Sequence, residues 1–130
     1  METIEQVREF FTNDRFATEN NAVIDEIGDG YARCSMDIMD KHKNAMGTVM
    51  GGATFTLADF AFAVAANWKK VGTVAINSNV AFLGTAKGTR LVAEAVIVKN
   101  GRSTCYCNVN VDDDLGNKVA AVTITGFHKN

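Results

Sequence analysis

The sequence predicts an α+β protein in which an antiparallel β-sheet wraps around one long central helix, with a short N-terminal helix before it. The chain has 130 residues, which predicts a single domain spanning residues 1–130. A long, nearly chargeless segment at 51–69 predicts the helix, and four strand candidates follow it. Because an antiparallel sheet must cover its apolar face, we expect this helix to be the element that covers it.

The elements before the central helix are short. Apolar residues at helical spacing predict an amphipathic helix over residues 3–13. Alternating residues then predict two strands, at 22–27 and 31–39, around a turn rich in glycine. Residues 40–50 are expected to form a loop.

The central helix is predicted from Gly51 to about residue 69, and its alanine-rich and phenylalanine-rich interior should be buried on most sides. Strands are expected after it in a mostly meander arrangement, at 73–82, 90–99, 102–112 and 118–128. The pair Asn100–Gly101 is the strongest hairpin signal in the chain.

Composition excludes several functional classes. The net charge of −2 leaves no basic excess for a nucleic-acid backbone. Three cysteines are an odd number for a disulfide framework, so a reducing, cytoplasmic setting is expected. The acidic N-terminus lacks the apolar region of a signal peptide. No segment is apolar over the roughly 20 residues that a membrane-spanning helix needs.

Asp59 is the one charged residue between Gly51 and Trp68. Helical spacing aligns it with Phe55 and Phe62, on or beside an apolar face. A buried charge is costly unless it is paired or neutralised. Two interpretations stay open: a structural carboxylate bonded to the backbone or a distant base, and a catalytic carboxylate that desolvation makes a stronger base.

Three glycines, Gly47, Gly51 and Gly52, precede or open the same helix. Glycines leave the N–H groups of a helix start unshielded, and such groups bind anions or an oxyanion. The plainer interpretation is a tight turn that needs a positive φ, and the pattern alone favours it.

The spacing of Gly51 and Asp59 constrains any site that uses both. Eight residues of helix separate them by about 12 Å at 1.5 Å per residue. One carbonyl cannot touch both within a single chain. A shared site must therefore combine the helix start of one subunit with the aspartate of another, which requires a dimer with antiparallel helices.

The histidines and cysteines predict no metal site. His42 and His128 have no partner at metal-ligand spacing, so both are expected to be solvated surface residues. Cys105 and Cys107 face the same way along a strand, which is typical of core filling. The chain has no P-loop and no dinucleotide-binding glycine motif.

The segment from Asn44 to Asp59, NAMGTVMGGATFTLAD, resembles the signature of hotdog-fold acyl-CoA thioesterases. It is most similar to the phenylacetate-degradation (PaaI-like) branch, with the pattern N-x-x-G-x-x-H-G-G-x-x-x-x-L-x-D. The similarity covers nearly the whole chain, including the hairpin at Gly101–Arg102. It implies a hotdog fold and thioester hydrolysis by a homodimer or homotetramer with sites at the subunit interface.

The resemblance also implies roles for individual residues. The family's carboxylate falls on Asp59, its backbone oxyanion donor on Gly51, and its asparagine, which places water or the carbonyl, on Asn44. Gly47 and Gly52 match positions that shape the loop. Asp59 would act on water as a general base, or on the thioester as a nucleophile through an anhydride.

The chain departs from the family pattern at two positions. The histidine before the glycine pair is Met50 here, and methionine cannot donate a hydrogen bond. A helper hydroxyl of some members aligns with Ala75, and Thr54, Thr56 or Asn77 are the candidates to replace it.

The substrate site is expected to include Met50 and an apolar acyl tunnel lined by Phe55 and Phe62. Aromatic, short and medium acyl groups all fit such a tunnel. Basic residues should hold the coenzyme A phosphates, and the candidates are Lys87, Arg90, Lys99 and Arg102. No cofactor is expected, because coenzyme A is part of the substrate, and neither is a nucleic-acid or membrane partner.

Three other functions were weighed. A non-catalytic acyl-CoA-binding protein would gain nothing from a charge at Asp59. A hotdog dehydratase or hydratase would need a histidine shortly after the aspartate, whereas the next one is His128. A purely structural dimer would leave Asp59 hydrogen-bonded and inert.

Overall fold

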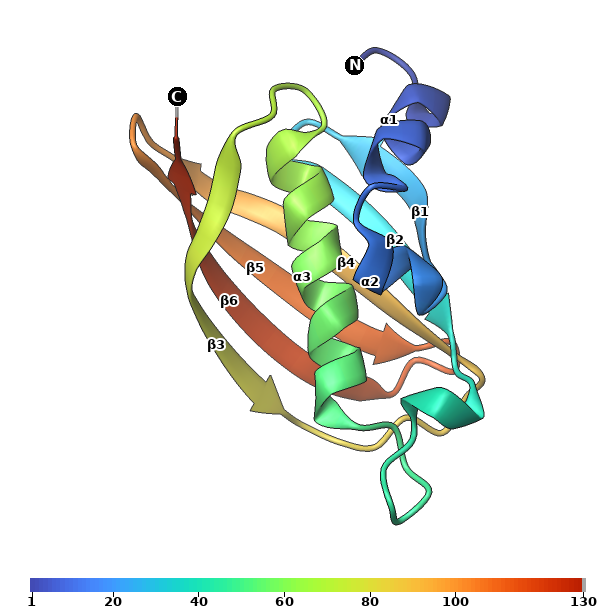
Figure 1. Ribbon diagram of the computed structural model, residues 1–130. Coiled ribbons are helices and arrows are strands. Elements are labelled where there is room, and N and C mark those ends of the chain that lie inside the picture. The colour runs from blue at the N-terminus through green and yellow to red at the C-terminus, as the bar shows by residue number, and fades with distance from the viewer. Residues whose placement is uncertain (130) are drawn as a thin grey trace.

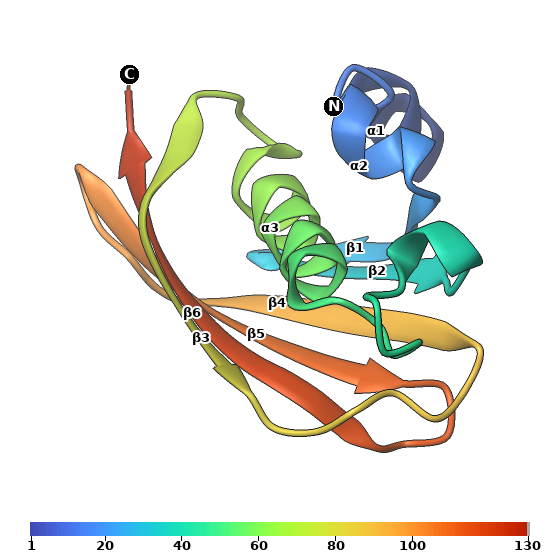
Figure 2. The ribbon, with the colours of Figure 1, turned by 60° about the horizontal axis from the view of Figure 1, so that its bottom comes forward.

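The computed structural model describes residues 1–129, and it consists of one antiparallel sheet that curls around helix α3 (Gly51–Asn67). Figure 1 shows α3 running along the concave face of the sheet, and Figure 2 shows the sheet wrapping around it. The predicted architecture is confirmed. The helix ends two residues earlier than expected, where Asn67 turns the chain toward the next strand.

The sheet has six strands in the order β1-β2-β4-β5-β6-β3. Their bounds are Ala22–Gly28 for β1, Tyr31–Asp37 for β2, Thr73–Phe82 for β3, Arg90–Asn100 for β4, Thr104–Asp113 for β5 and Lys118–His128 for β6. The meander is correct for β4, β5 and β6 but wrong for β3. That strand pairs with β6 at the far edge, so the β3–β4 connection crosses the end of the sheet.

The N-terminal region forms two helices where one was expected. α1 (Ile4–Phe11) begins with a capping box in which Thr3 and Gln6 exchange hydrogen bonds. The chain then turns and forms α2 (Arg15–Glu19), which was not predicted because five residues are too few for a periodic pattern. Both helices lie on the same side of the sheet as α3, near β1 (Figure 2).

The core lies between α3 and the inward side chains of the strands. Leu57 and Val64 of the helix meet Leu91, Val109 and Ile124 of the sheet, and all are fully buried. Cys107 is buried in the same layer, and its burial raises the pKa of the thiol to about 12. The predicted core-filling role of Cys105 and Cys107 is confirmed. No helix within residues 1–129 combines the length and the apolar character needed to cross a bilayer.

Candidate functional site

The start of α3 leaves backbone donors open. Met50 is the N-cap residue, and its side chain makes no capping hydrogen bond. Its carbonyl accepts from Ala53 N (3.1 Å) and Thr54 N (3.3 Å). The N–H groups of Gly51 and Gly52 have no acceptor within the part of the chain that the structure describes. Two donors at the positive end of a helix are therefore available to an oxygen that carries negative charge.

The loop before α3 is held by Asn44. Its Oδ1 accepts from Met46 N (3.0 Å), Thr48 N (3.2 Å) and Thr48 Oγ1 (3.2 Å), and Gly47 takes a φ of 84°. The glycine conformation is the turn requirement that the sequence suggested. Asn44 thus organises the loop through its oxygen. Its Nδ2 has no partner among the described residues and stays exposed, so it remains free to meet a ligand.

His42 supports the same loop, and the expectation of a solvated side chain is wrong. It is 3% exposed. Its Nδ1 accepts from Met39 N (3.0 Å), and its Nε2 bonds Asn20 O at 3.0 Å. Its carbonyl accepts from Met50 N (2.8 Å) and so fixes the chain just before the helix. His128 is also not free, because its ring bonds Thr73 Oγ1 and Asn100 Oδ1.

A cavity of about 500 Å³ opens beside Gly51. Its lining comes from the start of α3, the end of β3 and the chain after β3, with the residues Val49, Gly51, Thr54, Phe82, Leu83, Gly84, Thr85, Ala86 and Val119. The ring of Phe82 lies so close to Gly51 that a Cβ there would sit 2.8 Å from Cζ. Glycine at position 51 therefore lets β3 approach the open end of the helix.

Sequence reasoning missed Phe82 and Leu83 as part of this cavity, because their place there depends on the far-edge position of β3. It named Thr54 only as a replacement for the family's helper hydroxyl. Thr54 is buried, lines the cavity, and has no hydrogen-bond partner for its hydroxyl among the described residues. Thr56 instead donates to Gly52 O (2.8 Å), and Asn77 lies on the exposed edge strand, outside the cavity.

Two aspartates fix the loop that lines the cavity. Asp113 Oδ2 accepts from Lys87 N (2.8 Å), Gly88 N (3.1 Å) and Asn117 Nδ2 (2.9 Å). Hydrogen bonds to Asn117 and to these backbone groups hold the pKa of Asp113 well below its usual range. Asp114 accepts from Thr89 N and Thr89 Oγ1. The loop after β3 is therefore tied to the β5–β6 turn.

Asp59 lies on the outward stripe of α3, together with Gly52, Phe55 and Ala63, the helix residues that are not buried. Its carboxylate is open to solvent in the single chain, so the expectation of a buried face holds only for its neighbours. The carboxylate makes no ion pair or hydrogen bond within residues 1–129. Desolvation by surrounding atoms raises the pKa of Asp59, and the charge of Asp14 raises it further.

Phe55 and Phe62, both expected to line an acyl tunnel, lie in different places. Phe55 is half-buried on the outward stripe. Phe62 is 2% exposed and packs in the core, where a Cβ on Gly126 would touch its ring. Its spacing of three residues from Asp59 turns it toward the sheet. Met50 is exposed beside Gly52, at the mouth of the loop.

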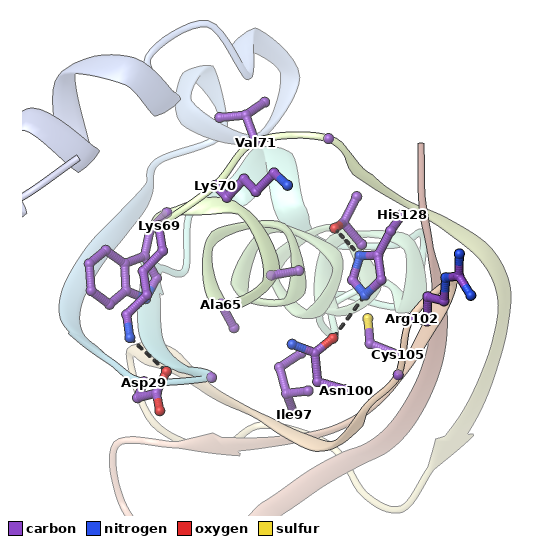
Figure 3. Close-up of a pocket in the computed structure, with 16 residues that line it drawn as sticks. Asp29, Ala65, Lys69, Lys70, Val71, Ile97, Asn100, Arg102, Cys105 and His128 are labelled. Carbon is purple, nitrogen blue, oxygen red and sulfur yellow. Dashed lines mark hydrogen bonds and ion pairs between the residues drawn. The ribbon is translucent and has the colours of Figure 1, made fainter. Parts of the chain in front are cut away.

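A second cavity, of about 460 Å³, lies at the opposite end of α3 (Figure 3). On one side Lys69 Nζ meets Asp29 Oδ1 at 2.7 Å, and on the other His128 bridges Thr73 and Asn100. Arg102 lines this cavity, whereas Arg90 pairs with Asp37 (3.1 Å) at the other end of β4. The two arginines are thus about 35 Å apart along the strand, at 3.3 Å per residue, and cannot hold one coenzyme A within one chain.

The comparisons identify the family. The thioesterase superfamily profile matches residues 46–120. A proposed esterase of Archaeoglobus fulgidus is 32% identical over 129 residues, which cover 98% of this chain and 84% of that protein.

The chain belongs to the thioesterase superfamily. Human acyl-coenzyme A thioesterase 13 is 30% identical over 95 residues, covering 71% of this chain and 68% of that protein. The structure of the E. coli PaaI protein from the phenylacetic acid degradation operon superposes with a TM-score of 0.89 at 24% identity, over 94% of this chain and 89% of that one. The predicted hotdog fold and PaaI-like resemblance are confirmed, and so is the predicted class of thioester hydrolase.

The superfamily member carries its chemistry on organic groups in the region described. No group of three or more His, Cys, Asp or Glu side chains is arranged to hold a metal ion within residues 1–129. What the start of α3 offers is a pair of open N–H donors beside a cavity, and what the middle of α3 offers is an unpaired carboxylate.

Proposed function

We propose that this thioesterase hydrolyses small aromatic or short to medium acyl-CoA thioesters in an active site that two copies of the chain build together. Gly51 N–H of one copy binds the carbonyl oxygen, and Asp59 of the other copy activates water. The observation that carries the proposal is the pair of unpaired N–H groups at the start of α3, opening onto a cavity. The human relative's name, acyl-coenzyme A thioesterase 13, supports the substrate class.

The edge strand β3 supports a dimer. It lies at the end of the sheet with one side unpaired, and its exposed apolar side chains include Ile76 (59%) and Phe82 (59%). Such an edge is a template for pairing with another chain. A second copy that adds its own β3 across a two-fold axis would extend the sheet and cover these side chains.

The same two-fold axis supports a shared site. It would set two α3 helices antiparallel, with their outward stripes facing each other. Gly51 and Asp59 are about 12 Å apart along one helix, too far for both to touch one carbonyl. Across antiparallel helices, the Gly51 of each copy would lie opposite the Asp59 of the other. Small side chains such as Ala63 on the stripe allow a close approach.

The proposed reaction is a water addition followed by loss of the thiol. Asp59 takes a proton from water as the oxygen attacks the carbonyl carbon, and the carbonyl electrons move to the oxygen held by Gly51 N–H. The tetrahedral intermediate then collapses, the C–S bond breaks, and the protonated Asp59 returns its proton to the thiolate. The products are the free acid and coenzyme A. The raised pKa of Asp59 favours proton transfer in both directions.

The test is thiol release from a panel of phenylacetyl, benzoyl, short-chain and medium-chain CoA thioesters. Wild type should turn over at least one member, and Asp59→Asn, nearly the same shape, should lower kcat by about 10²–10⁴-fold. Asp29→Asn, a charge removed at the far end of α3, is the matched control and should leave kcat unchanged. Thermal stabilisation by acyl-CoA without any turnover would contradict the proposal and favour a binding protein.

Single-turnover hydrolysis in ¹⁸O-labelled water separates the two roles of Asp59. A general base places the label directly in the released acid. An anhydride intermediate instead places an unlabelled carboxylate oxygen in the first product, and this result would replace the base with a nucleophile.

A further inference from the structure

Asp14 occupies a helix-capping position without acting as a cap. It is the N-cap residue of α2, yet its carboxylate makes no capping hydrogen bond. It forms no ion pair within residues 1–129 either, since the neighbouring Arg15 pairs with Glu19. An N-cap aspartate ordinarily accepts from the backbone and stabilises its helix by about 1 kcal/mol. The structural explanation for a carboxylate at this position is therefore absent.

The turn that carries Asp14 is fixed against α3 next to Asp59. The ring of Phe11, at the end of α1, meets Phe60 edge-on with centroids 6.0 Å apart. Asp14 N donates to Phe11 O at 3.0 Å, so the turn is bonded to the residue that makes this contact. Phe60 directly follows Asp59 on the helix, and α2 itself packs against α3. Two unpaired carboxylates are thus held on adjoining elements.

The other charged groups on elements around α3 are engaged elsewhere. Arg8 donates to Ile24 O, and the ion pairs of the surrounding elements are Arg15–Glu19, Arg33–Glu26, Lys43–Asp40, Lys69–Asp29 and Arg90–Asp37. Asp25 acts on Cys34, Glu94 accepts from Tyr31, and Asp113 is saturated by the loop after β3. Among these groups, Asp14 is the one whose charge raises the pKa of Asp59. Partial burial raises the pKa of Asp14 as well.

We infer that Asp14 is a positioning residue of the thioesterase site, whose carboxylate acts on Asp59 of the same chain through its negative charge. This inference rests on the proposed function, in which Asp59 is the base. A base works best when its proton affinity approaches the working pH, and a nearby like charge moves a carboxylate in that direction. The N-terminal helices then serve the reaction as well as covering the core.

The direct test follows the Asp59 carboxyl carbon by NMR as pH is lowered, in wild type and in Asp14→Asn. Asparagine caps helices as well as aspartate does, so α2 should keep its stability. Removing the charge should lower the pKa of Asp59. Glu9→Gln removes the same charge from an exposed position on α1 and is the control. An Asp59 titration that is the same in all three proteins would overturn the inference.

Two further readouts separate a charge effect from a structural one. Asp14→Glu keeps the charge and should restore the wild-type titration. Added salt should lower the pKa of Asp59 in wild type more than in Asp14→Asn, since salt screens the repulsion. In active enzyme, the acid limb of kcat/KM should move to lower pH in Asp14→Asn. The NMR titration needs no turnover, so an inactive wild type would defeat the proposed function without deciding this inference.

Discussion

The two ends of α3 treat their backbone groups in opposite ways. At the C-terminal end, Asn67 donates to Ala63 O and Thr73 O and accepts from Gly72 N and Thr73 N. Trp68 Nε1 adds a bond to Gly28 O at 2.8 Å. At the N-terminal end, Gly51 and Gly52 keep open N–H groups, and the N-cap side chain is a methionine that cannot accept them well.

This difference separates structure from function within one helix. Helix ends are ordinarily satisfied by caps, as the C-terminal end is. The N-terminal end gives up a cap that serine or aspartate would supply, and it does so beside a cavity. A local rule broken next to open space is the expected mark of a functional site. Both ends have a cavity, so the state of the polar groups distinguishes them and the volume does not.

The sharpest way to break the comparison is to remove the open donor itself. Gly51→Pro deletes the N–H but suits the first turn of a helix, and Met50 already has the extended backbone that precedes proline. We expect kcat to fall by about 10²–10³-fold, the effect of losing an oxyanion donor.

Gly51→Ala is the matched control, because it keeps the N–H while its Cβ crowds the ring of Phe82 in the same way. The comparison of kcat between the proline and alanine variants isolates the donor. Equal kcat values for the two would show that space, and not the N–H, matters at this position.

The C-terminal end should respond in stability and not in rate. Asn67 is 7% exposed, and Asn67→Ala leaves the N–H groups of Gly72 and Thr73 without their acceptor. The free energy of unfolding should fall by about 2–3 kcal/mol, measured by urea denaturation. At pH 7 and a temperature where the variant stays folded, kcat should be that of wild type. A large loss of kcat would instead place chemistry at this end.

The fold of the chain is largely readable from its sequence, while the site is readable only in part. β3 and β6 have the predicted bounds, because alternation and glycine turns are local signals. The far-edge place of β3 is not local, since it depends on which strand β6 finds as its partner. The burial of His42 likewise depends on Asn20 and Met39, whose contacts no spacing rule encodes.

The catalytic candidates stood out because Asp59 and the glycine pair break the pattern of a buried helix. Phe82 and Leu83 could not be found in this way, since apolar residues at the end of a strand are unremarkable in a sequence. Asp14 was also missed, because its interest lies in a contact between α2 and α3 and in a cap that it does not make.

The tether of the cavity loop gives a smaller effect on binding. Asp113→Asn weakens the bonds that hold Lys87 N and Gly88 N, so KM for acyl-CoA should rise by about tenfold while kcat changes less. The lowered pKa of Asp113 means that its ionised form contributes stability above pH ~4, which is lost as pH falls toward the folded pKa. Urea unfolding between pH 2.5 and 7 should therefore show a shallower acid loss in the variant. Parallel curves would contradict this role.

The smallest effect should come from restoring the missing cap. Met50→Ser gives the first turn of α3 a side-chain acceptor, which should raise the free energy of unfolding by up to about 1 kcal/mol. Because the new cap competes for the same donors, kcat should fall severalfold. Thermal unfolding and initial rates on one preparation check both. A gain in stability with no change in rate would separate the cap from the site.

The central claim, that each site joins Gly51 of one copy to Asp59 of the other, is tested most directly by mixed dimers. Copies carrying Gly51→Pro and Asp59→Asn, each with its own affinity tag, are coexpressed and the heterodimer is purified. One of its two sites would be intact, so it should have about half of the wild-type activity although neither parent is active. A heterodimer of wild type with the doubly substituted chain should be inactive. An inactive first heterodimer and a half-active second one would place each site within a single chain and contradict the account.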